Sequence, residues 1–177
     1  MIFTPSKLEG VFEISLEPRV DERGMFARIF CIEEFDKQGI EFKPIQINNS
    51  TNARKGTIRG LHYQMGEHAE AKLFRCIHGS IFSVGIDIRK DSPTYKQWMG
   101  ITLTADNRNM VYYPKGYAVG YQALEDGAEV LYASSTPYAP GVEGGIRYND
   151  PAFAIKFPIV DTISVSEKDL RWENFTG

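Results

Sequence analysis

Apolar and polar residues alternate along several short stretches in the middle of the chain. The clearest is Ser80–Ile88, where every second side chain from Phe82 onward is large and apolar. A period of two predicts a β-strand with one buried face. A second alternation, from Trp98 to Thr104, predicts another strand. Further short β-forming runs cover Met110–Tyr113, Tyr117–Leu124 and Glu129–Ser134.

Turn-forming residues separate these runs at intervals of about ten residues. They include Asp91-Ser92-Pro93, Pro114-Lys115-Gly116 and Glu125-Asp126-Gly127. Many short strands at this spacing are typical of an all-β sandwich or barrel. We therefore expect an all-β, double-sheet or barrel fold that forms a single domain over residues 1–177.

Helical signals are few and lie outside the predicted strands. The pattern of Ile32–Gln38 predicts a short helix that ends at Gly39. Ser166 predicts the N-cap of a second short helix near the C-terminus. Residues 138–151 are rich in Pro, Gly and Asn, which predicts a long covering loop.

Composition and charge narrow the class of protein. Of 177 residues, 42% are hydrophobic and 24% charged, which excludes a disordered or collagen-like chain. The net charge is -3, whereas proteins that bind nucleic acid through phosphates usually carry excess positive charge. No stretch approaches the ~18 apolar residues of a membrane span, and no signal peptide is visible. We therefore expect a cytoplasmic protein that binds neither nucleic acid nor membranes, with Cys31 and Cys76 as buried, reduced thiols.

Candidate chemistry begins with the three histidines, which are His62, His68 and His78. His62 stands out because Arg59, Gln64 and Lys72 place polar groups near it in otherwise apolar predicted strands. On one continuous strand, His62 and His68 would lie about 20 Å apart, too far to share a metal ion. We therefore expect no metal site. The chain also lacks glycine-rich phosphate-binding loops and a nucleophile elbow.

Several longer motifs follow one another along the chain. They are Gly56-Thr57-Ile58-Arg59-Gly60-Leu61-His62-Tyr63-Gln64, Ala71-Lys72-Leu73, Tyr113-Pro114-Lys115-Gly116-Tyr117-Ala118, Glu129-Val130-Leu131-Tyr132, Gly145-Ile146-Arg147-Tyr148-Asn149-Asp150-Pro151 and Ser166-Glu167-Lys168-Asp169. In order and spacing they resemble the dTDP-4-dehydrorhamnose 3,5-epimerase family, from about Phe12 to Trp172. The resemblance implies a metal-free, cupin-type jelly roll, normally a homodimer. It also implies cofactor-independent action on a nucleoside-diphosphate 4-keto-6-deoxy sugar.

The resemblance implies four catalytic side chains. A C4 ketone acidifies the C–H bonds at C3 and C5, and returning a proton to the opposite face inverts the carbon. The implied roles are His62 as base, Asp169 as its partner, Lys72 at the enolate oxygen and Tyr132 as the acid on the far face. By position alone, Asp169 fits a helix capping box, Lys72 a strand edge and Tyr132 a half-buried strand.

The resemblance also implies a set of substrate-binding residues. They are Tyr138 and Glu143 beside the sugar, Arg59 and Lys115 at the diphosphate, Arg23 and Phe26 at the nucleotide (often from the partner subunit), and Gln46 and Asn48 near both. Arg59 and His62 have opposite parity, so a regular strand would point them to opposite faces. We therefore predict a bulge at Gly60 that turns both toward the site.

Two departures from the family pattern matter for the substrate. The family usually has Gly-Phe-Ala-His-Gly-Phe at residues 116–121, and Val119 replaces the histidine that lines the substrate pocket. Arg28 replaces a glutamate, so a hydrogen-bond acceptor near the nucleotide base becomes a donor. These changes predict an altered nucleotide, with CDP as the leading variant, an altered sugar, or inversion of one centre only.

The sequence thus predicts an isomerase, a nucleotide-sugar epimerase of deoxysugar biosynthesis. One alternative is a nucleotide-sugar 3,4-ketoisomerase of related fold, whose paired-histidine pattern this chain lacks. Another is a non-catalytic sugar-binding cupin, against which the intact set of His62, Asp169, Lys72 and Tyr132 argues. A metal-dependent cupin is the third.

Overall fold

The structure, a computed structural model, describes residues 1–161 and 163–177. The first elements are β1 (Ile2–Pro5), β2 (Phe12–Ser15), β3 (Arg19–Asp21), β4 (Gly24–Phe26), α1 (Ile32–Asp36), β5 (Gln46–Asn52), β6 (Thr57–Gln64), a 3-10 helix (Gly66–His68) and β7 (Lys72–His78). They are followed by β8 (Ser80–Asp87), β9 (Trp98–Thr104), β10 (Met110–Tyr113), β11 (Tyr117–Ala123), β12 (Ala128–Ser134), β13 (Glu143–Gly145), β14 (Ser164–Val165) and α2 (Glu167–Leu170).

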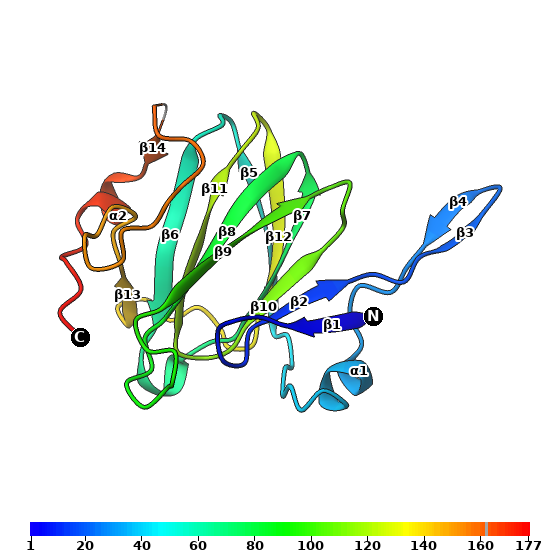
Figure 1. Cartoon of the computed structure of the whole chain (residues 1–177), viewed down its shortest axis with the longest axis horizontal. Coiled ribbons are helices and arrows are strands. Elements are labelled where there is room, and N and C mark those ends of the chain that lie inside the picture. Colours follow the sequence, from blue (N-terminus) through cyan, green and yellow to red (C-terminus); the bar gives the residue numbers. More distant parts are fainter. Residues whose placement is uncertain (162) are drawn as a thin grey trace.

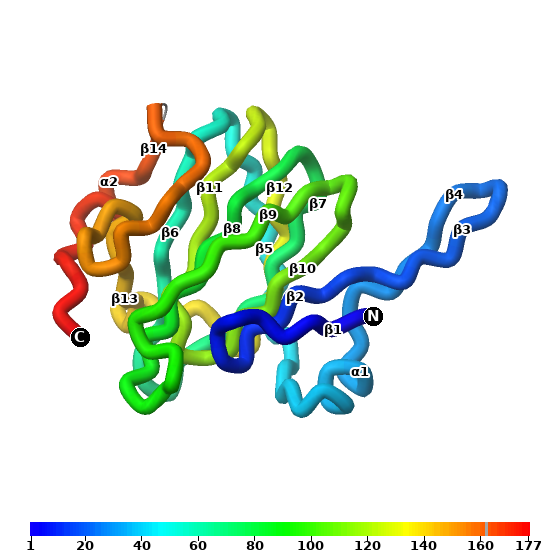
Figure 2. Tube along the Cα trace, in the orientation of Figure 1, coloured from blue at the N-terminus to red at the C-terminus, as the bar shows by residue number. Residues whose placement is uncertain are grey.

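The strands form two main layers within the described residues (Figure 1). One sheet has the order β1-β2-β10-β7-β12-β5, and the other has the order β13-β6-β11-β8-β9. All of these pairs are antiparallel, whereas β14 adds to β6 in parallel. The trace in Figure 2 shows the β3–β4 hairpin projecting away from both layers. The predicted all-β, double-sheet fold is confirmed.

The largest core cluster lies between the two sheets and is strongly aromatic. Phe74 from one sheet packs against Tyr113 and Tyr121, and Val130 and Leu103 complete the same cluster. A second cluster, around Phe35 and Phe42, attaches α1 to the outer side of the first sheet. These two clusters therefore pack both faces of the first sheet and join it to the second sheet.

Strand β8 differs from its prediction because both of its faces are buried. The predicted apolar face, with Val84 and Ile86, is covered by the C-terminal segment through Phe153 and Phe157. The opposite face, which includes Ser83, points into the space between the sheets and is also closed. The alternation therefore located the strand correctly. It could not predict burial of the outer face, because the residues that cover this face follow about seventy positions later in the sequence.

Other local predictions were confirmed in part. Ser166 caps α2, since its Oγ accepts a hydrogen bond from the backbone N–H of Asp169 at 3.1 Å. Residues 138–151 are not all loop, because β13 pairs with β6. The strand that carries His62 ends at Gln64, so His68 lies on the 3-10 helix rather than on that strand. Cys76 is buried as predicted, whereas Cys31 is only half-buried at the start of α1.

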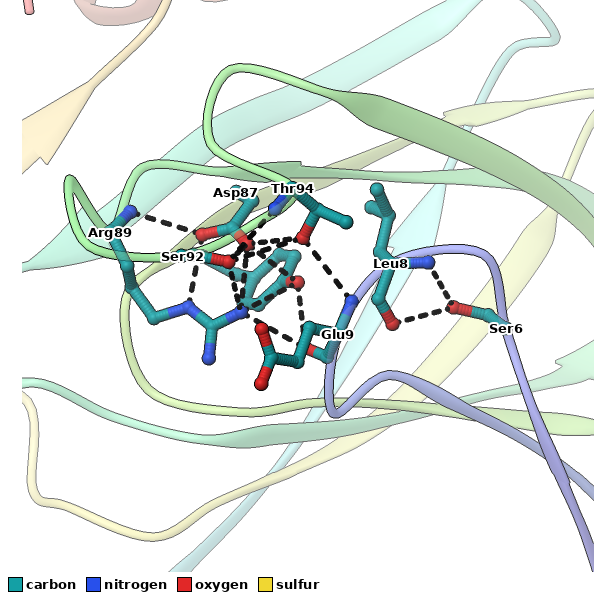
Figure 3. Close-up of polar contacts among 8 residues, drawn as sticks. Ser6, Leu8, Glu9, Asp87, Arg89, Ser92 and Thr94 are labelled. Atoms are coloured by element: carbon teal, nitrogen blue, oxygen red, sulfur yellow. Dashed lines mark hydrogen bonds and ion pairs between the residues drawn. The ribbon is translucent and has the colours of Figure 1, made fainter.

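A dense polar network joins the N-terminal segment to the second sheet (Figure 3). Asp87 is fully buried at the end of β8 and accepts hydrogen bonds from Arg89, Ser92, Thr94 and Tyr117. The pKa of Asp87 is lowered because these hydrogen bonds outweigh the opposing effect of burial.

No helix among residues 1–161 and 163–177 is long and apolar enough to cross a membrane.

Candidate active site

A cavity of about 440 Å³ opens between the two sheets, beside α2. Its walls combine charged, hydroxyl and aromatic side chains from widely separated parts of the chain. The lining residues are Ser50, Thr57, Ile58, Arg59, His62, Lys72, Phe74, Val119, Gly120, Tyr121, Tyr132, Ser164, Val165, Ser166, Lys168 and Asp169. The four predicted catalytic residues therefore line one cavity, together with Arg59 and Val119.

His62 and Asp169 form a close polar pair in the cavity wall. His62 Nε2 lies 2.6 Å from Asp169 Oδ1, and the two side chains are 33% and 6% exposed. Burial acts to raise the pKa of Asp169, but the hydrogen bonds from His62, Gly60 N and Ser166 outweigh it, so that pKa is lowered. The ionised carboxylate holds the proton on Nε2. In the neutral tautomer that this contact favours, the other ring nitrogen, Nδ1, carries the lone pair that can accept a proton.

A bulge in β6 explains how Arg59 and His62 reach the same cavity. Val119 stands opposite His62 and Tyr121 opposite Arg59, so Gly60 and Leu61 together face the single residue between them on β11. Gly60 has a φ of +110°, and a Cβ there would lie 2.8 Å from the Val119 carbonyl oxygen. The bulge predicted at Gly60 is therefore confirmed, and only glycine fits it without strain.

Lys72 and Tyr132 approach the cavity from the first sheet. Lys72 Nζ is 2.8 Å from Glu70 Oε1, and both side chains are nearly buried. Tyr132 stacks on Phe74 with ring centroids 5.3 Å apart. Burial, with a smaller contribution from Glu70, raises the pKa of Tyr132. The phenol is therefore protonated at neutral pH, while Lys72 presents a positive charge that a nearby carboxylate balances.

Glu143 is not part of the cavity wall but pairs with Lys168, which is. It belongs to β13 rather than to the long loop predicted over residues 138–151, and its Oε2 is 2.5 Å from Lys168 Nζ. Burial acts to raise its pKa, but the hydrogen bonds from Lys168 and Tyr138 prevail and lower it. Tyr138 contacts β5, because its backbone N–H donates to Gln46 Oε1 at 2.6 Å. These contacts connect the 138–145 segment to β5 and α2.

Several other predicted residues lie outside the cavity in a single copy of the chain. Asn48 is on β5 directly opposite Tyr132 but is not part of the cavity wall. Arg23 and Phe26 are on the exposed β3–β4 hairpin, where Arg23 pairs with Asp21. Arg28 is 2.9 Å from Glu34, near α1, and Lys115 borders a separate surface hollow. The chain alone thus brings together the catalytic set but not the predicted nucleotide-binding residues.

Sequence reasoning missed several residues of the site. Glu70, Ser50 and Tyr121 gave no signal, because their proximity to the cavity depends on contacts between distant strands. Ser164 and Val165 belong to the cavity wall because β14, which they form, pairs with β6.

Within the part of the chain that the structure describes, no three His, Cys, Asp or Glu side chains gather as a metal-binding group.

Residues 5–177 match the family model described as dTDP-4-dehydrorhamnose 3,5-epimerase. The chain belongs to this family. A Salmonella typhimurium member is 41% identical over 157 residues, 87% of this chain and 85% of its own length.

Solved structures of family members agree with this assignment. The Elizabethkingia anophelis epimerase superposes with a TM-score of 0.96 at 32% identity, covering 99% of this chain and 96% of that one. The Legionella pneumophila enzyme, crystallised with dTDP-4-keto-L-rhamnose, has a TM-score of 0.91 at 33% identity, covering 98% and 92%. The cupin-type jelly roll expected for the family is thereby confirmed.

The two departures from the family pattern have different settings. Val119 is buried in the cavity wall opposite His62, so it changes the polarity of the cavity directly. Arg28 is exposed and forms a salt bridge with Glu34, away from that wall. Within one copy of this epimerase-family chain, only Val119 is therefore placed to contact a molecule in the cavity.

Proposed function

We propose that this protein is a cofactor-independent epimerase that inverts C3 and C5 of a dTDP-linked 4-keto-6-deoxy sugar. The observation that carries the proposal is one cavity lined by the His62–Asp169 pair, Lys72 and Tyr132. The family relatives are named as 3,5-epimerases, and the Legionella structure contains a dTDP-4-keto sugar. These findings favour epimerisation over ketoisomerisation and over sugar binding without catalysis.

The first step removes a proton next to the C4 ketone. His62 Nδ1 takes the proton from C3 or C5, and the electron pair of that C–H bond forms the enolate. The imidazolium that results carries a positive charge directly against Asp169. Because Asp169 is nearly buried, its charge is poorly screened and stabilises the imidazolium effectively.

The second step returns a proton from the opposite side. Lys72 stabilises the negative charge on the C4 oxygen of the enolate. Tyr132 donates its phenolic proton to the carbon, which inverts the centre, and the proton balance is restored by exchange with solvent before the next turnover. The raised pKa of Tyr132 suits this role, because the phenol is held in its proton-donating form.

Substrate binding uses the rest of the predicted set. Arg59 would hold the diphosphate, and Tyr138 and Glu143 would close over the sugar. We propose that the chain acts as a homodimer in which Arg23 and Phe26 of the hairpin reach the nucleotide of the partner subunit. The 70% exposure of Phe26 favours such a partner. The cytoplasmic location expected from the sequence stays a prediction.

The decisive experiment follows hydrogen exchange by NMR. The purified protein is incubated in D₂O with dTDP-4-keto-6-deoxyglucose, and with the CDP-linked sugar in a parallel sample. We expect deuterium at C3 and C5 of the dTDP sugar. The His62→Ala variant should keep its fold and lose about 1,000-fold of this exchange rate, because no other base replaces the imidazole.

His78→Ala is the matched control, since His78 is exposed and its ring hydrogen-bonds Gly127 O, outside the cavity wall. It should exchange at the original rate. Label at one carbon alone would support single-centre action, and faster turnover of the CDP sugar would support altered nucleotide choice. The absence of exchange with either sugar, or unchanged exchange in His62→Ala, would refute the epimerase.

A further inference from the structure

A buried hydroxyl group links the two sheets at the cavity. Tyr121 on β11 places its hydroxyl 2.6 Å from Ser50 Oγ on β5, and Asn52 Nδ2 lies 3.4 Å from the same hydroxyl. Tyr121 is 3% exposed and Asn52 is 1% exposed. The aromatic ring already packs edge-on against Phe74, a contact that a phenylalanine would also make. The hydroxyl therefore needs an explanation other than packing.

The carboxamide of Asn52 is held in one orientation. Its Nδ2 donates to Ala128 O at 2.9 Å, which leaves the second hydrogen of Nδ2 for the Tyr121 hydroxyl. Oδ1 accepts from Arg59 Nε at 2.9 Å and lies 3.5 Å from the same Tyr121 hydroxyl. A reversed amide would set N–H donors against the guanidinium, which has only donors. Ala128 O and Arg59 thus fix the orientation of the amide, and the Tyr121 hydroxyl holds it in place by contacting both of its ends.

Arg59 is fixed at the cavity wall by two acceptors. Besides Nε to Asn52, its terminal nitrogen donates to Thr51 O at 3.2 Å. The remaining N–H donors stay available to an anion in the cavity. A guanidinium held in one orientation loses less conformational entropy when it binds phosphate oxygens.

We infer that Tyr121 is a positioning residue for Arg59, and through it for the diphosphate of the substrate. The inference rests on the proposed function, because it takes a diphosphate as the group that Arg59 binds. Tyr121 acts without contacting the reacting carbons. It raises affinity for the diphosphate by holding Asn52, and Asn52 in turn holds the guanidinium.

The test uses the Tyr121→Phe variant of the full chain and isothermal titration with dTDP and with thymidine. Loss of one hydrogen bond predicts about five-fold weaker dTDP binding. Thymidine carries no phosphate, so its affinity should not change. In turnover assays, KM should rise by about the same factor, and more than kcat falls. A residue that only stabilised the fold would not separate the two ligands in this way.

Two further variants sharpen the result. Tyr113→Phe removes a buried hydroxyl that pairs with Ser83 at 3.1 Å, outside the cavity wall, and should leave both affinities unchanged. In an Arg59→Ala background, Tyr121→Phe should cause no additional loss of dTDP affinity, because the two residues act as one unit.

The inference is overturned if Tyr121→Phe binds dTDP like the wild type, weakens thymidine equally, or weakens dTDP in the Arg59→Ala background. A wild-type protein that binds no dTDP would instead overturn the proposed function, and the inference with it. Because the wild-type titration is read first, the two failures are distinguishable.

Discussion

At the scale of single residues, the proposed reaction depends on Tyr132 keeping its proton until the enolate forms. The ring is clamped by Phe74, and burial raises the pKa of the phenol, with Glu70 acting in the same direction. Lys72 stands beside Glu70 and supplies the positive charge for the C4 oxygen. Glu70 thus acts on both the proposed acid, Tyr132, and the positively charged group, Lys72.

The Tyr132→Phe variant should separate proton removal from inversion. The stacking on Phe74 survives, so the fold is retained, and His62 can still remove and return a proton on its own side. We expect epimer formation to fall about 100-fold while solvent deuterium still enters the substrate. Proton NMR of substrate and product measures both rates, and Tyr112→Phe, outside the cavity wall, is the control. Simultaneous loss of exchange and inversion would contradict the assigned role.

Residue chemistry was predictable from sequence only where a motif carried it. His62 was identified by its polar neighbours, and the family resemblance pointed to Asp169, Lys72 and Tyr132. Ser50 and Tyr121 were not identifiable, because their contact spans 71 positions and crosses from one sheet to the other. An isolated sequence has no periodicity that records such a contact.

At the scale of elements, the bulge in β6 sets the geometry of the site. Gly60 combines a φ of +110° with backbone atoms of Val119 and Gly120 within 3 Å of where a Cβ would be. Gly60→Ala should therefore cost about 3 kcal/mol, from the strained backbone and the clash together. This corresponds to a fall of roughly 10 °C in the thermal unfolding midpoint. Differential scanning calorimetry measures the change.

Gly24→Ala separates the steric clash from the backbone conformation. Gly24 has a similar φ of +124°, but nothing lies within 4 Å of its Cβ position, and its hairpin is exposed. Its midpoint should fall much less than that of Gly60→Ala. Equal falls in the two variants would show that contact with β11 does not determine the requirement for glycine.

Hydrophobic alternation predicted β8 to β12 well but gave no indication of β5. On β5 the side chains that share the inner face with Tyr132, such as Asn48 and Ser50, are polar, while Ile47 points outward and is 67% exposed. Because the side chains toward the cavity are polar and Ile47 is the single apolar residue of this strand, β5 lacks the alternation of an ordinary core strand. The polar side chains that face the cavity thus replace the apolar residues from which a strand is predicted.

At the scale of the whole molecule, segments far apart in sequence stabilise one another around buried charge. The pair Asp87 and Arg89 joins β8, β11 and the N-terminal segment, since Arg89 and Tyr117 also donate to Glu9 O. An almost identical local pair exists on the hairpin, where Arg23 donates from its backbone N–H and its guanidinium to Asp21. The two pairs differ chiefly in burial, because Asp87 is fully buried while the Asp21 side chain is 44% exposed.

This difference predicts which pair controls stability in acid. The pKa of Asp87 is lowered from its ordinary value of 3.8, so its contribution is complete above about pH 4. The contribution is lost as the pH falls toward the folded-state pKa. Asp87→Asn should therefore reduce the free energy of unfolding at pH 7 by about 2 kcal/mol, and should lose less stability than the wild type on further acidification.

Denaturant unfolding, followed by tryptophan fluorescence from pH 7 to pH 2, measures both effects. Asp21→Asn removes the same negative charge and one acceptor oxygen in solvent, where water compensates, and should follow the wild-type curve at every pH. If Asp87→Asn also followed that curve, the buried network would not stabilise the protein. If Asp21→Asn lost as much stability as Asp87→Asn, the local Asp-x-Arg turn would be the cause, and the burial that joins three distant segments would be irrelevant.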